Sequence, residues 1–156
     1  MFAASPASSN VVVATVVIAT SVFVDVLRST WYVWAPVEPV SLVHEDVILS
    51  MPPYALWLEG KYDMLEFLTG RASHCEGNVH IPVEVNASAG LAFYQPTRSG
   101  DTFEPFSIQV IDLVGPTITA IHNFLDVRLF ERFGLPSAPV ASRTLAALAS
   151  GPRNSV

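Results

Sequence analysis

A run of strand-like segments joined by very short turns constrains this chain more than any other feature. Residues 78–86 alternate apolar and polar side chains, and residues 90–95 form a short aromatic strand. Residues 103–114 and 116–125 form two longer strands with only a Gly-Pro break between them. Turns this short can join antiparallel neighbours, but they leave no room for the crossover that parallel neighbours need. We therefore predict an antiparallel sheet.

Helical segments lie on either side of this strand run. Residues 60–70 carry apolar side chains at helical spacing, and residues 126–133 form a short helical turn that Gly134 ends. A helix followed by four closely joined strands is an α+β pattern. We predict a strongly curved, cone-shaped antiparallel sheet packed on helices, whose mouth is suited to a small molecule.

The loop before the first of these helices is rich in aromatic residues. Residues 51–60 read MPPYALWLEG and follow a short strand over residues 46–50. Two adjacent prolines end that strand because neither has a backbone N–H to donate. Tyr54 and Trp57 then either line the mouth of the cone or plug the end of the sheet as core aromatics.

Composition narrows the range of partners. The chain has a formal net charge of −6 and a pI of about 5.0, and no stretch is rich in lysine or arginine. Phosphate backbones need clustered positive charge, so we expect no direct nucleic-acid binding. Charged residues make up only 14% of the chain, which predicts a large hidden apolar surface, a cavity or an interface. A homodimer through an exposed sheet face is one such interface.

The two ends of the chain differ from its middle. Residues 11–24 are an apolar run that is shorter than the ~20 residues a membrane-spanning helix needs, and no basic residue precedes it. We therefore expect residues 1–40 to be an atypical apolar segment, not a membrane anchor. From residue 139 the chain is rich in alanine, serine and proline. This predicts a loose tail over residues 139–156, with a helix over residues 142–149 as the alternative.

Cysteine and histidine usage gives little sign of metal chemistry. Cys75 is the single cysteine, so an internal disulfide framework is excluded and a cytoplasmic location fits best. No partner cysteine or regular ligand spacing accompanies it. His44, Glu45 and Asp46 form a sequential triplet, which is a weak metal signal. We expect neither a metal ion nor a cofactor.

Five segments, taken in order, resemble one known family. They read DVILSMPPYALWLEG at 46–60, NASAGLAFY at 86–94, FEPFSIQV at 103–110, ITAIHNFLD at 118–126 and LFERFGLP at 129–136. They are similar to the SnoaL-like C-terminal domain of bacterial extracytoplasmic-function (ECF) sigma factors, which belongs to the nuclear-transport-factor-2 (NTF2) superfamily. The resemblance covers residues 41–138. It implies a cone-shaped α+β domain that regulates the sigma factor, by contacting its other domains or by sensing a ligand.

The chain departs from that family in two places. Such sigma factors carry promoter-binding and polymerase-binding domains ahead of this one, and we expect neither here, so this chain should not recognise a promoter alone. Family members also open with an amphipathic lid helix and a second short helix, and residues 11–40 show neither pattern. An altered reading frame or start upstream of about residue 41 is one explanation for a foreign stretch there.

Two polar residues, Gln109 and His122, lie in the middle of predicted strands, where sheet faces are buried. A buried polar side chain must be hydrogen-bonded, either to a neighbour or to a ligand. Histidine titrates near neutral pH, so His122 can act as a base if it faces the cone. Asp126 is the second catalytic candidate, or else it caps the turn that follows.

The resemblance implies a pocket inside the cone. Enzymes of the superfamily place carboxylates and tyrosines there, but no second acid or arginine at matching spacing accompanies Asp112 and Asp126. The sequence therefore favours binding over catalysis. The predicted pocket residues are Tyr54, Trp57, Phe67, Tyr94, Gln109, His122 and Phe124.

These observations predict a non-enzymatic SnoaL-like pocket domain with a regulatory or ligand-sensing role related to sigma-factor-dependent transcription. Its expected partners are an apolar small molecule and a sigma factor or RNA polymerase. The alternative is a small-molecule isomerase or hydrolase of the same fold that acts on an apolar substrate.

Overall fold

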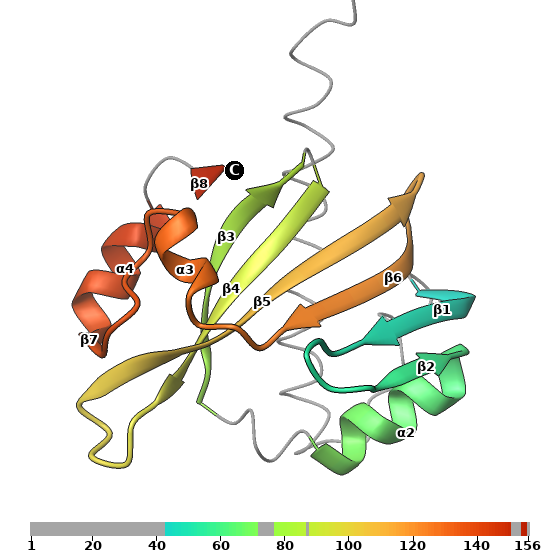
Figure 1. The fold of residues 1–156 in the computed structure, drawn as a ribbon, viewed down its shortest axis with the longest axis horizontal. Coiled ribbons are helices and arrows are strands. Elements are labelled where there is room, and N and C mark those ends of the chain that lie inside the picture. Colours follow the sequence, from blue (N-terminus) through green and yellow to red (C-terminus); the bar gives the residue numbers. More distant parts are fainter. Residues whose placement is uncertain (1–42, 72–76, 87, 151–153, 156) are drawn as a thin grey trace, which may run out of the picture.

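The computed structural model describes residues 43–71, 77–86, 88–150 and 154–155 (Figure 1). The predictions for residues 1–40 and for Cys75 lie outside these ranges. The described elements are β1 (Val43–Ser50), β2 (Trp57–Glu59), α2 (Lys61–Arg71), β3 (Val79–Val85), β4 (Ser88–Pro96), β5 (Thr102–Val114), β6 (Thr117–Phe124), α3 (Leu129–Arg132), β7 (Val140–Ala141), α4 (Ser142–Ser150) and β8 (Asn154–Ser155).

The strands form one curved sheet that does not close into a barrel, with the order β2-β1-β6-β5-β4-β3-β8, and β7 pairs with β5 (Figure 1). The predicted antiparallel run is confirmed from β3 to β6. Two pairs differ from the prediction, because β1 lies parallel to β6 and β8 lies parallel to β3. Long stretches of chain separate the members of each pair, so no tight turn forces them to be antiparallel.

One face of the sheet packs against α2, and we call it the α2 face. Leu49 pairs with Ile121, which pairs with Ile111, so these three side chains point to the same side. Met64 of α2 is buried in the same cluster. The apolar side of the helix predicted over residues 60–70 therefore packs against residues of β1, β6 and β5.

A β-bulge extends this cluster by one residue. Between β5 and β6 the register shifts after Asp112, so that Leu113 pairs with Ile118. The extra residue in β6 reverses the alternation, which turns Ile118 toward the α2 face with Ile111 and Ile121.

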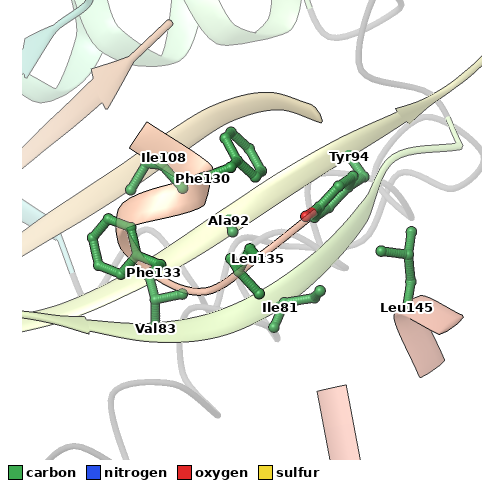
Figure 2. Close-up of a cluster of buried hydrophobic side chains, with 9 residues drawn as sticks. All are labelled: Ile81, Val83, Ala92, Tyr94, Ile108, Phe130, Phe133, Leu135 and Leu145. Atoms are coloured by element: carbon green, nitrogen blue, oxygen red, sulfur yellow. The ribbon is translucent and has the colours of Figure 1, made fainter. Parts of the chain in front are cut away.

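The opposite face carries a second cluster beneath α3 and α4. Figure 2 shows side chains of β3, β4 and β5 meeting those of α3, α4 and the loop between them. Tyr94 and Phe130 pack edge to face with ring centroids 5.0 Å apart. The Tyr94 hydroxyl donates a hydrogen bond to the Pro136 carbonyl oxygen at 2.8 Å. This cluster comprises Ile81, Val83, Ala92, Tyr94, Ile108, Phe130, Phe133, Leu135 and Leu145.

The loose tail predicted from residue 139 is corrected over residues 140–150, where the helical alternative holds. Residues 140–141 add β7 to β5, and α4 follows directly. Leu145 is fully buried, and Leu148 packs against the same cluster. Burial of two leucines at helical spacing stabilises a segment whose alanine and serine content suggested a loose tail.

Two backbone positions require glycine. Gly134 has φ of +64° and ends α3 as predicted, because the left-handed conformation is open to glycine without steric cost. Gly90 lies where β4 and β5 approach closely. A Cβ atom there would lie 2.8 Å from the Gln109 carbonyl oxygen, so a larger residue would push the two strands apart.

Candidate functional site

Three polar side chains meet across β1, β6 and β5. Ser50 Oγ lies 2.7 Å from His122 Nδ1, and His122 Nε2 lies 3.4 Å from Asp112 Oδ2. Ser50 is buried, His122 is partly buried, and the Asp112 side chain is 50% exposed. We call these residues the serine–histidine–aspartate array.

Strand register explains why they meet. Ser50 pairs with His122, and Asp112 pairs with Ala120, two residues before His122 in the same strand. Side chains that are paired or diagonal across neighbouring strands point to the same face and lie within reach of one another. The array therefore follows from the insertion of β1 beside β6.

The array can orient an imidazole and carry a proton. When the ring proton is on Nε2, it faces the Asp112 carboxylate, and Nδ1 accepts a hydrogen bond from the Ser50 hydroxyl. A serine, a base and an orienting carboxylate in sequence are the components of nucleophilic acyl transfer. The same contacts also satisfy polar groups in a largely apolar sheet, which is the outcome predicted for a mid-strand histidine.

A second polar pair lies on the α2 face. Gln109 of β5 and Asn123 of β6 are directly paired, and Gln109 also pairs with Leu91 of β4. Asn123 Oδ1 is buried and has no hydrogen-bond partner within the part of the chain that the structure describes. An unsatisfied buried carbonyl oxygen is costly, so this position is suited to a donor from a bound molecule.

The register separates the predicted pocket residues. His122 pairs with Val110, whereas Gln109 pairs with Asn123, so Gln109 and His122 point to opposite faces of the sheet. Phe67 of α2 packs on the α2-face cluster, Tyr94 is buried beneath α3, Phe124 pairs with Ile108 on that same side, and Tyr54 and Trp57 are exposed at the β1–β2 hairpin.

The aromatic loop does not plug the sheet. It joins β1 to β2 through a turn in which Tyr54 N–H donates to the Met51 carbonyl oxygen at 2.9 Å. Trp57 begins the short edge strand β2, where a loop was predicted. Tyr54 and Trp57 are both largely exposed, so they are not core aromatics.

Asp126 adopts the capping alternative. Its carboxylate accepts hydrogen bonds from the Arg128 side chain and from the Arg128 backbone N–H. These bonds, the side-chain bonds first, hold the pKa of Asp126 below its ordinary value. This partly exposed carboxylate therefore orders the local turn over residues 126–128, which precedes α3.

The triplet at residues 44–46 is engaged in local contacts. Asp46 N–H donates to His44 Nδ1, and Lys61 Nζ donates to Glu45 Oε1 at 3.0 Å, which ties α2 to β1. Within the described ranges, no group of three or more histidine, cysteine or acidic side chains is placed to hold a metal ion. No helix in those ranges is long and apolar enough to cross a membrane.

Sequence reasoning missed Ser50 and Asn123 as functional candidates. Ser50 is separated from His122 by 72 residues, and only the parallel pairing of β1 with β6 brings them together. Asn123 follows His122 directly, so strict alternation marks it as facing the other side. The signal for Asn123 was therefore present, whereas the signal for Ser50 was not.

Part of the chain is similar in sequence to a sigma factor. The chain is 30% identical over 101 residues to the ECF RNA polymerase sigma factor SigG of Mycobacterium tuberculosis, in two strains. The match covers 64% of this chain and 27% of that sigma factor. The matched part of this chain thus spans only about a quarter of the length of that sigma factor. No family model matches the sequence.

Solved structures show the fold. A protein from Kribbella flavida has a TM-score of 0.52 and 15% identity, covering 77% of this chain and 90% of that chain. A phenazine biosynthesis-related protein, phzb2, from Pseudomonas aeruginosa has a TM-score of 0.50 and 10% identity, covering 85% and 93%. The chain has the SnoaL-like fold of the NTF2-like proteins. The fold predicted from the resemblance is therefore confirmed, and these low identities show the fold alone.

Proposed function

We propose that this chain is a SnoaL-like pocket domain with a regulatory or ligand-sensing role in sigma-factor-dependent transcription, acting in the cytoplasm. The observation that carries the proposal is the 30% identity to a sigma factor over 101 residues, on a chain with this fold. The proposed partners are a sigma factor or RNA polymerase and an apolar small molecule.

The α2 face supports the ligand-binding part of the proposal. Gln109 and Asn123 are neighbouring neutral amides, and none of the described residues offers a hydrogen-bond partner to the buried Asn123 oxygen. Leu91 and Ile121 next to them are buried and apolar, and Phe67 of α2 packs on the same face. An apolar surface with a few polar groups that fix orientation is typical of a small-molecule site.

The regulatory role is tested by transcription in vitro. RNA polymerase, SigG and a SigG-dependent promoter are incubated with and without the full chain. We expect the chain to change transcript yield by about fivefold or more, a coupling of the size usual for regulation. Unchanged yield over a wide concentration range of the chain contradicts the role.

The ligand is tested separately by native mass spectrometry. We expect the purified full chain to retain a neutral, apolar molecule, and Asn123→Leu to retain less of it, because leucine cannot accept a hydrogen bond. Asp101→Asn is a matched control, since Asp101 is exposed in the turn between β4 and β5. Equal retention by both variants contradicts a site at Asn123.

A second candidate function, a hydrolase, is favoured by the serine–histidine–aspartate array. In that reaction the Ser50 hydroxyl attacks an ester carbonyl, its proton passes to His122 Nδ1, and the alcohol leaves with that proton. Water then attacks the acyl-enzyme and releases the acid. The test is hydrolysis of p-nitrophenyl butyrate, with a loss of at least about 100-fold expected in Ser50→Ala. Activity that is equal in Ser50→Ala and the unsubstituted chain excludes this candidate.

A further inference from the structure

The strand registers define a second surface, on the side of the sheet opposite α2. Glu59, Ile48, Ala120 and Asp112 are neighbours in one row across β2, β1, β6 and β5. Trp57, Ser50, His122 and Val110 form the adjacent row. We call these two rows the open face.

The described helices pack chiefly on other parts of the sheet. α2 covers the α2 face, whereas α4 packs against β3 and α3 against the part of β5 that carries Ile108. Figure 1 shows α3 and α4 at the end of the sheet away from β1 and β2. On the open face, Trp57 is 61% exposed, Glu59 is exposed, and Ile48 and Val110 are partly exposed.

We infer that the open face docks a positively charged surface of a sigma factor, namely one that also binds promoter DNA. This inference rests on the proposed role in sigma-factor-dependent transcription. The inference assigns the contact with the sigma factor to the residues of the open face and specifies a positively charged partner surface.

The negative charge of the open face favours a partner with a positively charged surface. Glu59 and Asp112 lie at the two ends of one row, and neither row contains a lysine or an arginine. An acidic surface gains from a basic partner, both in the rate of encounter and in specificity. A second copy of the same face presents the same carboxylates, so like charges oppose a homodimer through these rows.

Trp57 supplies the anchor that such a contact needs. A tryptophan at the surface is among the residues that most often carry binding energy in interfaces. Arginine stacks on its ring and pairs with a nearby carboxylate such as Glu59, two residues further along β2. Part-buried Ile48 and Val110 provide apolar contacts, and the carboxylates form the polar rim.

A sigma factor offers a surface of the required kind. Proteins that bind DNA gather lysine and arginine where they meet the phosphates. The matched segment covers only 27% of SigG, so most of that sigma factor lies outside the match. When the open face occupies a basic surface, it excludes the phosphate backbone from the same residues, and promoter DNA therefore competes with the chain.

The experiment measures binding of the full chain to SigG of Mycobacterium tuberculosis by biolayer interferometry, at low and at high salt. We expect Trp57→Ala to weaken binding about tenfold or more and Glu59→Lys by about fivefold, with the Glu59 effect shrinking at high salt. Promoter duplex DNA should displace the chain. Matched controls are Tyr62→Ala, an aromatic of α2 that is 80% exposed, and Asp101→Lys, an exposed acid in a distant turn; both should bind within about twofold of the unsubstituted chain.

Each other outcome overturns the inference in a distinct way. Binding of Trp57→Ala and Glu59→Lys equal to that of the unsubstituted chain excludes the open face as the docking surface. Sedimentation that shows a dimer lost in Trp57→Ala, with SigG binding unchanged, assigns the face to a second copy of this chain. If the chain alters transcription without binding SigG, the docking inference fails and the proposed function stands. If it neither binds nor alters transcription, both fail.

Discussion

The two halves of the sheet differ in what lies on the side opposite α2. Over β3, β4 and the start of β5, that side is covered by α3 and α4, and Tyr94 and Phe130 pack there in a closed apolar cluster. Over β2, β1, β6 and the end of β5, the same side carries exposed Trp57 and the serine–histidine–aspartate array. The same side of the sheet is therefore buried as a core over β3 and β4 and exposed as a surface over β2 and β1.

We expect the covered half of the sheet to determine the stability of the fold and the exposed half to bind a partner. Phe130 is fully buried, whereas Trp57 is mostly in water, although both are large aromatics on the same side of the sheet. Buried apolar area stabilises the fold, whereas an exposed aromatic side chain contributes little to stability and is available to a partner. Substitutions at the two ends should therefore change different measurements.

The largest expected effect is that of Phe130→Ala. Removing a buried phenylalanine should cost about 3–5 kcal/mol of unfolding free energy, because the loss of contacts leaves a cavity. Trp57→Ala is the matched control at the open end and should cost about 0.5 kcal/mol or less. Urea unfolding monitored by circular dichroism measures both. Equal losses in the two variants would remove the distinction between the halves.

An intermediate effect is expected for Ser50→Ala. The substitution leaves His122 Nδ1 without its 2.7 Å partner, which should destabilise the fold by about 1–2 kcal/mol. Thr119→Val is the control, because Thr119 Oγ1 makes a longer, exposed bond of 3.3 Å to the Asp112 carbonyl oxygen. Chemical denaturation compares the two. A Ser50→Ala variant as stable as the unsubstituted chain would show that the array does not hold β1 to β6.

Tyr94, in the half of the sheet covered by α3 and α4, should make the stability of the fold depend on pH. Burial raises the pKa of the Tyr94 hydroxyl well above its ordinary value of 10.0. The folded state therefore holds this proton more tightly than the unfolded state does. The stabilisation is complete below pH ~10 and is lost as pH rises above it.

Tyr94→Phe tests this effect. At neutral pH the variant should be less stable by about 1 kcal/mol, because the hydrogen bond to the Pro136 carbonyl oxygen is lost. Above pH ~10 its stability should fall less steeply than that of the unsubstituted chain. Thermal unfolding as a function of pH measures the slopes, and parallel curves would mean that Tyr94 does not titrate on unfolding.

The smallest expected effect is that of Asp126→Asn. Hydrogen bonds from Arg128 lower the pKa of Asp126 from 3.8, so its contribution is present above that pH and is lost as pH falls through the lower folded value. The variant should be slightly less stable at pH 6 and should match the unsubstituted chain in strong acid. A stability difference that persists in strong acid would point to a cause other than this carboxylate.

The fold could be predicted from the sequence to a large extent, because its signals are local. Alternation identified β3, and the Gly115-Pro116 break bounded β5 and β6, each within a residue or two, while Gly134 marked the end of α3. The short strand β2 was missed, because three residues are too few to show a period. The tail helix was only an alternative, since Leu145 is stabilised by contacts with β3 and α3 that no local pattern reveals.

The candidate site was less predictable, because it depends on register. Alternation correctly grouped His122 with Phe124, and Gln109 with Ile111, within each strand. Alternation could not show that these two groups lie on opposite faces of the sheet. That conclusion depends on the register, in which Val110 and not Gln109 pairs with His122. The same limit hid Ser50, whose strand joins the sheet from far away in sequence.

Hydrogen–deuterium exchange of the full chain, with and without SigG, tests the central claim most directly. We expect SigG to slow exchange in peptides that cover residues 43–59 and 117–124, the strands of the open face, and to leave residues 129–150 unchanged. Slower exchange confined to residues 129–150, or no change anywhere at saturating SigG, would contradict the account.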